Sequence, residues 1–206
     1  MLKNRYLFIW QDNFLEHLSQ NEQIKLKFRT ARKREVIYAN KIKFILFISG
    51  SAHLKYYSDN NEYILGLVRP DNFIVLDELT GLEMLEKSEF YELSFKDLIS
   101  LCENEKFSAS VINALVRNLL SQRDMTYDYT FLSIEERIVK FLSQAYEHKK
   151  CSDGIVSVCD ITTMAQLLGA SRQNVSKAIN TYIKDGLLKK IDRNTYDITE
   201  LLKSLK

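Results

Sequence analysis

The chain has 206 residues and a mass of 24.1 kDa, and 46% of its residues are hydrophobic, so it is long enough for one large domain or two ordinary ones. With six glycines, one proline and 27% charged residues, the composition excludes collagen-like, low-complexity and disordered chains. The 29 basic and 27 acidic residues give a net charge of +2, which is too close to neutral to indicate a nucleic-acid-binding protein by itself.

The apolar run near the start of the chain ends at Gln11, far short of the roughly 18 residues of a membrane-spanning helix. We therefore expect a soluble cytoplasmic protein without membrane contact. The three cysteines Cys102, Cys151 and Cys159 lack the spacing of a metal site, and we expect isolated reduced thiols. A disulfide between Cys151 and Cys159 across a hairpin is the alternative.

Residues 25–95 hold most of the aromatic and β-branched runs of the chain. Short strands are predicted at residues 35–38, 44–48, 52–57, 63–68, 73–76 and 89–93. Turn signals separate them at residues 49–51, 58–61, 70–72 and 80–81. This regular pattern predicts an antiparallel, jelly-roll-like β roll. We interpret the basic cluster Arg32, Lys33 and Arg34 as a solvated hairpin edge, with contact to DNA flanks or to an anionic effector as the alternative.

The pattern becomes helical after Ser94, with a short helix predicted at residues 95–103 and a long one at 105–129, which lacks glycine and proline. The long helix carries a seam with a 3.5-residue period, formed by Val111, Leu115, Asn118, Gln122, Met125 and Tyr129. A second apolar strip consists of Ile112, Val116, Leu119 and Leu120. Two strips indicate two neighbours, and we expect the β roll and the seam of a second subunit. A core helix in a monomer is the alternative.

A third region begins at Ser133 and Glu136, which have the spacing of a capping box and predict a helix to about residue 149. After a turn at residues 152–154 and a strand at 155–158, residues 160–186 have the pattern of helix, tight turn and helix. Asp160 is predicted to cap the first helix, Gly169 to end it and Ser171 to cap the second. The predicted buried face of the second helix consists of Val175, Ala178, Ile179, Tyr182 and Ile183.

The polar face of this second helix predicts DNA binding. Arg172 and Gln173 lie in its first turn, the part of a recognition helix that reaches base edges in the major groove. Arginine pairs with guanine and glutamine with adenine, and a helix start such as Ser171 suits a phosphate. We expect Arg172, Gln173 and Lys177 near the bases. The complete predicted DNA-contact set is Ser171, Arg172, Gln173, Ser176, Lys177, Asn180, Lys189, Lys190 and Arg193.

Three members of that set belong to a predicted β hairpin that follows the second helix. Residues 187–191 and 196–198 form its strands around a turn at 192–194, which is typical of the wing of a winged helix-turn-helix. Lys189, Lys190 and Arg193 would contact the DNA backbone. Thr199 is predicted to cap a last helix at residues 200–205. A sensor or interaction module whose winged helix contacts a protein instead of DNA is the alternative.

Residues 165–177 (AQLLGASRQNVSK) resemble the helix-turn-helix of the Crp/Fnr family of bacterial transcription regulators, with weaker likeness at residues 47–52 and 67–73. The resemblance implies an α+β chain with a β-roll sensor-like domain at residues 1–104, a dimerisation helix at 105–132 and a winged helix-turn-helix DNA-binding domain at 133–206. It also implies a homodimer on a pseudo-palindromic operator. RNA polymerase and an unidentified small-molecule effector in the β roll are further candidate partners.

The resemblance also shows a departure. Cyclic-nucleotide-binding members hold the sugar and phosphate with a Gly-Glu pair and a later Arg-Ser or Arg-Thr pair, but residues 74–88 contain no arginine. Asp77 and Glu78 would repel a phosphate, so we expect no control by cyclic AMP. Three scattered cysteines do not suit an iron–sulfur cluster, and His17 and His53 carry no haem motif. We expect no cofactor and no metal.

We expect no enzymatic activity either, since no catalytic constellation stands out and His148 near Cys151 fits a polar helix end.

The near-neutral total charge is an average over two parts of the chain with different net charges. Residues 133–206 hold 12 basic and 9 acidic side chains, a net charge of +3, whereas residues 1–132 have a net charge of −1. This modest excess predicts specific, salt-sensitive binding rather than strong non-specific attraction to DNA.

Overall fold

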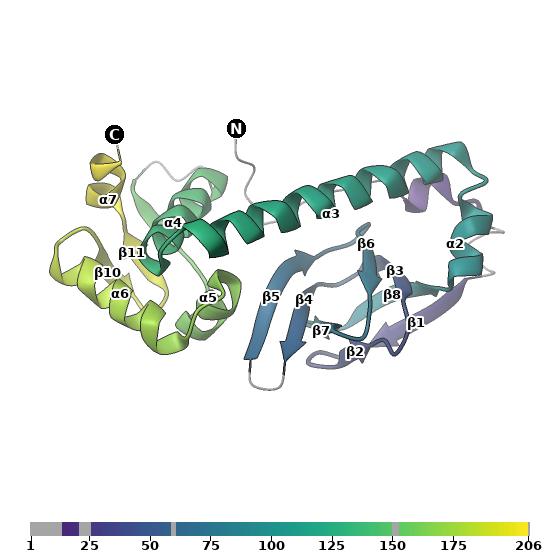
Figure 1. Cartoon of the computed structure of the whole chain (residues 1–206), viewed down its shortest axis with the longest axis horizontal. Helices are drawn as coiled ribbons and strands as arrows, with labels where there is room; N and C mark the ends of the chain where they lie inside the picture. Colours follow the sequence, from purple (N-terminus) through teal and green to yellow (C-terminus); the bar gives the residue numbers. More distant parts are fainter. Residues whose placement is uncertain (1–13, 21–25, 59–60, 150–152, 206) are drawn as a thin grey trace. The chain divides into compact units, whose positions relative to one another are not determined.

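The structure is a computed structural model that describes residues 14–20, 26–58, 61–149 and 153–205. The chain forms two compact units, one within Phe8–Arg123 and one within Asp124–Lys206. Figure 1 shows a β roll in the first unit and a small helical domain with a hairpin in the second. The predictions for the first ten residues and for Cys151 lie outside the described residues, and the three-part division of the chain stays a prediction.

The β roll is antiparallel, as the sequence predicts, and consists of two four-stranded sheets. The strands are β1 (Lys27–Ala31), β2 (Val36–Tyr38), β3 (Lys43–Ser49), β4 (Ala52–Ser58), β5 (Asn61–Val68), β6 (Phe73–Leu76), β7 (Thr80–Met84) and β8 (Ser88–Leu93). One sheet has the order β1-β8-β3-β6 and the other β2-β7-β4-β5. Arg32, Lys33 and Arg34 are exposed in the loop between β1 and β2, so this cluster is solvated as predicted. The two strands belong to different sheets, so the loop is not the edge of a hairpin, and that part of the prediction is wrong.

Two strands of the roll were not predicted. Strand β7 occupies the position of the predicted turn at residues 80–81, so that prediction is wrong. Gly81 pairs with Tyr38 on β2 and Lys55 on β4, and a Cβ at this glycine would lie 2.7 Å from the ring of Tyr57 and 3.1 Å from that of Tyr38. The glycine therefore makes room for two tyrosine rings, whose centroids are 5.3 Å apart. The other strand, β1, has mostly exposed side chains and no apolar run.

Apolar side chains fill the space between the two sheets. Phe47 and Phe90 stack there with ring centroids 6.3 Å apart. A second core covers the other face of the β1-β8-β3-β6 sheet, where Phe44 and Phe73 contact the short turn η2 (Leu15–His17) and the helices α2 (Phe95–Leu101) and α3 (Glu105–Phe131). Phe107 at the start of α3 is fully buried in this core. The core therefore fixes α3 to the roll at its beginning.

Helix α3 is 27 residues long, slightly longer than predicted. The boundary between the two units falls inside it, after Arg123. In the described part of the chain, no helix is both long and apolar enough to cross a membrane.

The second unit is a winged helix domain. Its elements are α4 (Ile134–Lys149), β9 (Ile155–Ser157), α5 (Ile161–Leu168), α6 (Arg172–Lys184), β10 (Lys189–Asp192), β11 (Thr195–Asp197) and α7 (Thr199–Ser204). Strands β10, β11 and β9 form a small antiparallel sheet. Ile138, Met164, Leu168, Val175 and Ile198 are buried in one core that joins the helices to this sheet. The predicted α+β fold class is thereby confirmed.

Candidate nucleic-acid interface

The turn between α5 and α6 is built as the sequence predicts. Asp160 caps α5 by accepting hydrogen bonds from the amides of Thr162 at 2.9 Å and Thr163 at 3.1 Å. Burial raises the pKa of Asp160, but its hydrogen bonds from Thr163 and Thr162 outweigh burial and hold the pKa below its usual range. Gly169 ends α5 with φ +62°, and Ser171 caps α6 by accepting from the amide of Asn174 at 3.2 Å.

Helix α6 has one buried and one exposed face. Val175, Ala178 and Ile179 are buried, and Tyr182 and Ile183 are half-buried, on the face predicted to be apolar. The opposite face lines a surface hollow of about 570 Å³, formed by Arg172, Gln173, Ser176, Lys177, Asn180, Thr181 and Lys184. Five of these residues belong to the predicted DNA-contact set. Thr181 and Lys184 were missed, although each follows a predicted residue by four positions and so lies on the same face.

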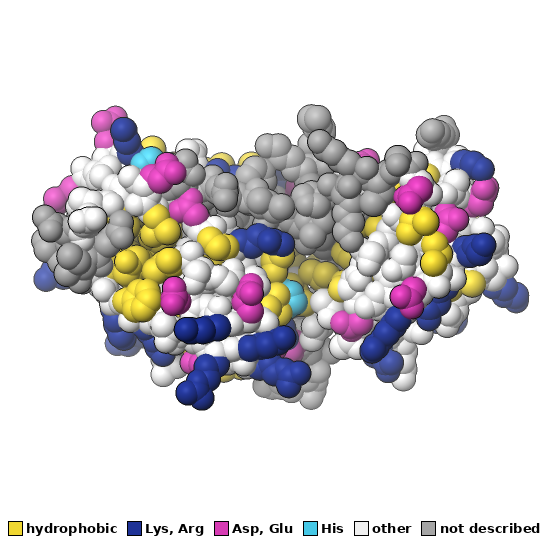
Figure 2. Space-filling model, turned by 180° about the vertical axis from the view of Figure 1, so that it is seen from behind, with side chains coloured by type: hydrophobic (Ala, Val, Ile, Leu, Met, Phe, Trp, Pro, Cys, Tyr) yellow, Lys and Arg dark blue, Asp and Glu magenta, His cyan; other side chains and the backbone are white. Residues whose placement is uncertain are grey.

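The hairpin of β10 and β11 presents the remaining predicted contacts. All four residues of β10 are exposed, so the ammonium groups of Lys189 and Lys190 reach water, and Arg193 is exposed in the turn. Among the described residues, no ion pair involves the cations of α6 or of this hairpin, which are Arg172, Lys177, Lys184, Lys189, Lys190 and Arg193. In Figure 2, Lys and Arg side chains gather on the side of this unit where α6 lies.

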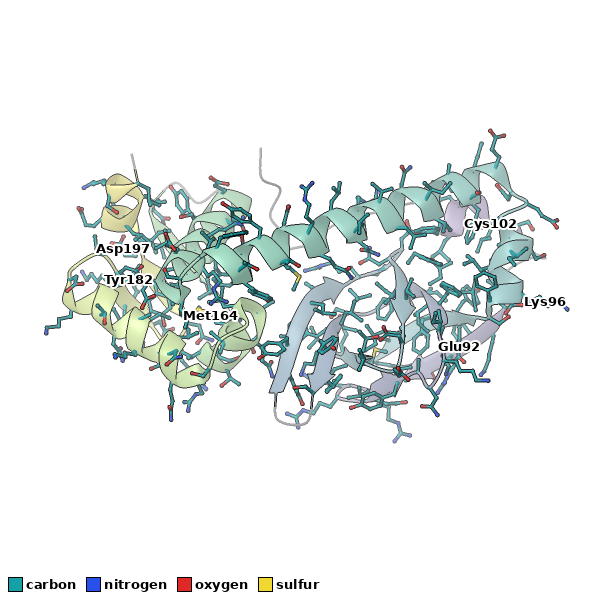
Figure 3. All side chains as sticks on the ribbon, in the orientation of Figure 1. Glu92, Lys96, Cys102, Met164, Tyr182 and Asp197 are labelled. Atoms are coloured by element: carbon teal, nitrogen blue, oxygen red, sulfur yellow. The ribbon has the colours of Figure 1, made fainter. Side chains whose placement is uncertain are left out.

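The prediction that Thr199 caps the last helix is wrong. Thr199 is the first residue of α7, and both its amide and its hydroxyl donate to Oδ1 of Asp197, at 2.9 and 2.6 Å. These hydrogen bonds lower the pKa of Asp197. Asp197, which Figure 3 labels at the end of the hairpin, therefore performs the capping role assigned to Thr199.

The six residues of the seam predicted on α3 have different environments. Val111 is buried in the core of the roll unit, Met125 is buried, and Tyr129 is half-buried in the winged helix unit. The other three, Leu115, Asn118 and Gln122, are exposed. Leu115 also belongs to a strip of apolar side chains that are 43–67% exposed. We call it the α3 strip, and its members are Ile112, Leu115, Val116, Leu119 and Leu120.

The resemblance draws attention to Asp77, Glu78 and His53 in the roll. In the described ranges, no group of three or more His, Cys, Asp or Glu side chains could hold a metal ion. Asp77 and Glu78 are exposed in the turn between β6 and β7. Burial, then the charge of Lys55, lowers the pKa of His53 on β4 despite the opposing charge of Glu83.

No protein-family model and no curated protein matches the sequence. Solved structures do match. A mutant of CooA from Carboxydothermus hydrogenoformans has a TM-score of 0.82 at 17% identity, covering 98% of this chain and 97% of that one. The c-di-GMP responsive global regulator CLP of Xanthomonas campestris has a TM-score of 0.73 at 18% identity, covering 90% and 98%. For a putative Crp/Fnr regulator from Eubacterium rectale the values are 0.67, 13%, 93% and 96%. The fold of this chain is thus similar to that of Crp/Fnr transcription regulators.

Proposed function

We propose that this chain, which has the fold of the Crp/Fnr transcription regulators, is a regulator that binds a pseudo-palindromic DNA operator as a homodimer. The observation that supports this most strongly is the exposed face of α6. It presents seven polar or basic side chains around a shallow hollow, while its other face is packed into the core. A helix of this kind fits the major groove, and its exposed cations lack partners within the described residues.

The predicted DNA contacts form two groups, those expected near the base edges and those expected at the phosphate backbone. Arg172, Gln173 and Lys177 lie in the first two turns of α6, where side chains approach base edges. Ser171 and Ser176 lie beside them, and Asn180, Thr181 and Lys184 continue the same face toward the C-terminal end of α6. Lys189, Lys190 and Arg193 on the hairpin would contact the phosphate backbone. Phosphate contacts set the position of the domain, and base contacts supply its specificity.

A second chain would cover the α3 strip. Five apolar side chains spaced three and four residues apart lie exposed along one helix, from Ile112 to Leu120. This spacing is typical of a helix that packs against a parallel copy of itself. The homodimer that we propose therefore uses the α3 strip together with exposed Asn118 and Gln122. Val111, Met125 and Tyr129, also predicted for the interface, are buried or half-buried within the single chain, so we leave them out of the proposed contact.

Cyclic AMP is not part of the proposal. The segment from β6 to β8 lacks an arginine that could neutralise a phosphate, and the space between the two sheets is occupied by apolar side chains. An unidentified effector and RNA polymerase remain candidate partners, and no enzymatic step is assigned. Because a regulator of this kind acts on the chromosome, the proposal includes a location in the cytoplasm.

Selection from random duplex DNA with the purified chain tests the proposal. We expect enrichment of a site with two inverted half-sites about one helical turn apart. The complex should shift in a gel at low salt and dissociate as salt increases, because bound cations displace counterions. Enrichment of no sequence, together with no shift at low salt, would overturn the proposal and favour an interaction module whose winged helix binds protein.

A further inference from the structure

The residues that line the exposed face of α6 include no acidic side chain. They are three cations, two amides and two hydroxyls: Arg172, Lys177 and Lys184, Gln173 and Asn180, and Ser176 and Thr181. A carboxylate would accept a hydrogen bond from the N4 amino group of cytosine, so this face lacks the side chain that pairs with cytosine. The groups that are present suit the purine edges, where N7 and O6 of guanine and N7 of adenine accept hydrogen bonds.

Adenine needs a partner that both donates and accepts. In the major groove it presents N7 as an acceptor beside its N6 amino group, and a carboxamide matches both. Lysine and arginine only donate, and the hydroxyl of Thr181 already donates to the carbonyl oxygen of Lys177 at 3.1 Å. The side chain of Ser176 has one polar atom and makes no bidentate contact. Among the lining residues, the bidentate pair with adenine is therefore open to Gln173 and Asn180.

The two amides differ in their position along α6. Gln173 is the second residue of the helix, in the first turn, which is the part of a recognition helix that reaches base edges. Asn180 lies seven residues later, about 10 Å further along the helix axis, and its side chain is one methylene group shorter. This difference favours Gln173 as the amide that contacts a base.

The carboxamide of Gln173 is available for such a contact. The residue is exposed, and its side chain has no hydrogen-bond partner in the part of the chain that the structure describes. The cap of the helix does not involve it, because Ser171 accepts from the amide of Asn174. Contact with DNA therefore breaks no internal hydrogen bond of this side chain.

Methylation of adenine at N6 changes the edge that a carboxamide would contact. In a base pair, one hydrogen of the N6 amino group bonds to thymine, and the other faces the major groove beside N7. A single N6-methyl group takes the position that faces the groove, because the other hydrogen is needed for pairing. It removes the donor that the Gln173 oxygen needs and crowds N7, whereas guanine contacts of Arg172 and Lys177 are unaffected.

We propose that Gln173 makes operator binding sensitive to adenine methylation: the chain binds half-sites that carry unmethylated adenine and loses affinity when that adenine is methylated at N6. This inference rests on the proposed function, since it names the base that the exposed face of α6 reads. Occupancy of the operator is then regulated by modification of the DNA itself, without a ligand in the β roll.

Methylation scanning of the selected operator tests the proposal. Each adenine of one half-site, on either strand, is replaced in turn by N6-methyladenine, and the affinity of the full chain is measured by fluorescence anisotropy. Methylation at one position should weaken binding about five- to hundredfold, the effect of losing a bidentate contact. N6-methyladenine outside the half-sites is the control and should change affinity less than about twofold. A half-site at which no methylation changes affinity more than about twofold would overturn the proposal.

Substitution of Gln173 tests whether this side chain causes the effect. Gln173→Ala should bind the unmethylated operator more weakly and bind methylated and unmethylated duplexes alike, within about twofold. Asn180→Ala is the matched control on the same face and should keep the wild-type response to methylation. Gln173→Glu should shift the preferred base at the sensitive position from adenine to cytosine, because a carboxylate only accepts. A response that survives Gln173→Ala, or that disappears in Asn180→Ala instead, would overturn the role of Gln173.

Failure of the proposed function has a different signature. A wild-type chain that enriches no sequence and shifts no duplex at low salt would overturn both proposals. A chain that binds its operator but tolerates N6-methyladenine at every position would overturn only this inference, and the proposed function would stand.

Discussion

Asp128 near the end of α3 has no exposed surface, and its two carboxylate oxygens accept hydrogen bonds from the ammonium group of Lys140 on α4 at 2.7 and 2.8 Å. The Lys140 side chain keeps one-fifth of its surface exposed. Removing such a pair from water costs free energy that is recovered only while both partners are present. The pair therefore stabilises the contact between these two helices as a unit, and loss of one member is worse than loss of both.

Replacing one member of this pair should be costly. Asp128→Ala leaves a largely buried ammonium group without its carboxylate and should lower the free energy of unfolding by about 3–5 kcal/mol. The double variant Asp128→Leu with Lys140→Met should recover most of that loss. Glu200→Ala is the control, since the Glu200–Lys203 pair has a similar distance of 2.7 Å but both side chains are more than half exposed, and it should cost at most about 1 kcal/mol. Urea denaturation followed by circular dichroism measures all three, and equal losses for Asp128→Ala and Glu200→Ala would contradict the argument.

Two glycines allow the energetic cost of backbone strain to be measured separately from that of a steric clash. Gly169 and Gly186 have similar positive φ angles, +62° and +76°, but only the former has a neighbour in the way of a Cβ. Gly186→Ala should cost about 1–2 kcal/mol for the left-handed conformation alone. Gly169→Ala should cost about 1–3 kcal/mol more, because the new methyl group meets the Tyr129 ring. Thermal unfolding of both variants gives the comparison, and equal losses would show that the ring moves aside freely.

The helical part of the chain could be predicted because its signals are local. The caps Asp160 and Ser171 and the terminator Gly169 act within four residues of their own position, so the sequence contains the whole interaction. The exposed face of α6 follows from helical periodicity once its buried face is known. Strand β7 was missed for the opposite reason, since Gly81 has the local signature of a turn and its place in a sheet depends on tyrosines 24 and 43 positions earlier in the chain.

The seam of α3 shows a different limit. A period of 3.5 residues indicates an apolar neighbour but does not say whether that neighbour is another chain or a distant part of the same one. Tyr129 fits the seam, yet its hydroxyl partner in the structure is Leu167, 38 positions later. Val111 likewise packs into the core beside β3 and α2. Contacts at such separations are set by the tertiary fold, which periodicity does not report.

Cys159 should be an unreactive thiol. Burial, and then the nearby Asp160 carboxylate, raises the pKa of Cys159 to about 12, so almost no thiolate is present at neutral pH. Alkylation of Cys159 by iodoacetamide at pH 8, mapped by mass spectrometry, should be much slower in the folded chain than in the chain unfolded by urea. The raised pKa also stabilises the fold below pH 9, and this contribution is lost as pH rises toward 12. Cys159→Ser should lose less stability than wild type between pH 9 and 11; rapid alkylation without urea would contradict the prediction.

Base and backbone contacts should respond differently to substitution. Arg172→Ala should cost about 1–3 kcal/mol of binding free energy and relax specificity at one position of each half-site. Lys189→Ala should weaken binding to all sequences, and because a homodimer carries the residue twice, the slope of log affinity against log salt should fall by about 2. Lys203→Ala on α7, where the ammonium group pairs with Glu200, is a control that should leave both quantities unchanged. Fluorescence anisotropy titrations at several salt concentrations supply the data, and a Lys189→Ala variant with the wild-type slope would remove the hairpin from the interface.

The α3 strip should determine the oligomeric state. Leu119 is 67% exposed in the single chain, so Leu119→Glu should leave the fold of the chain intact. In the proposed homodimer the same change would bury two carboxylates in an apolar seam, and we expect monomers at micromolar concentration and loss of palindrome binding. Ile99→Glu on α2 adds the same charge at a similarly exposed apolar position, 56%, and should leave the dimer unchanged. Sedimentation equilibrium of the three proteins decides the point: a wild-type monomer, or a Leu119→Glu dimer as stable as wild type, would show that the strip is not the interface.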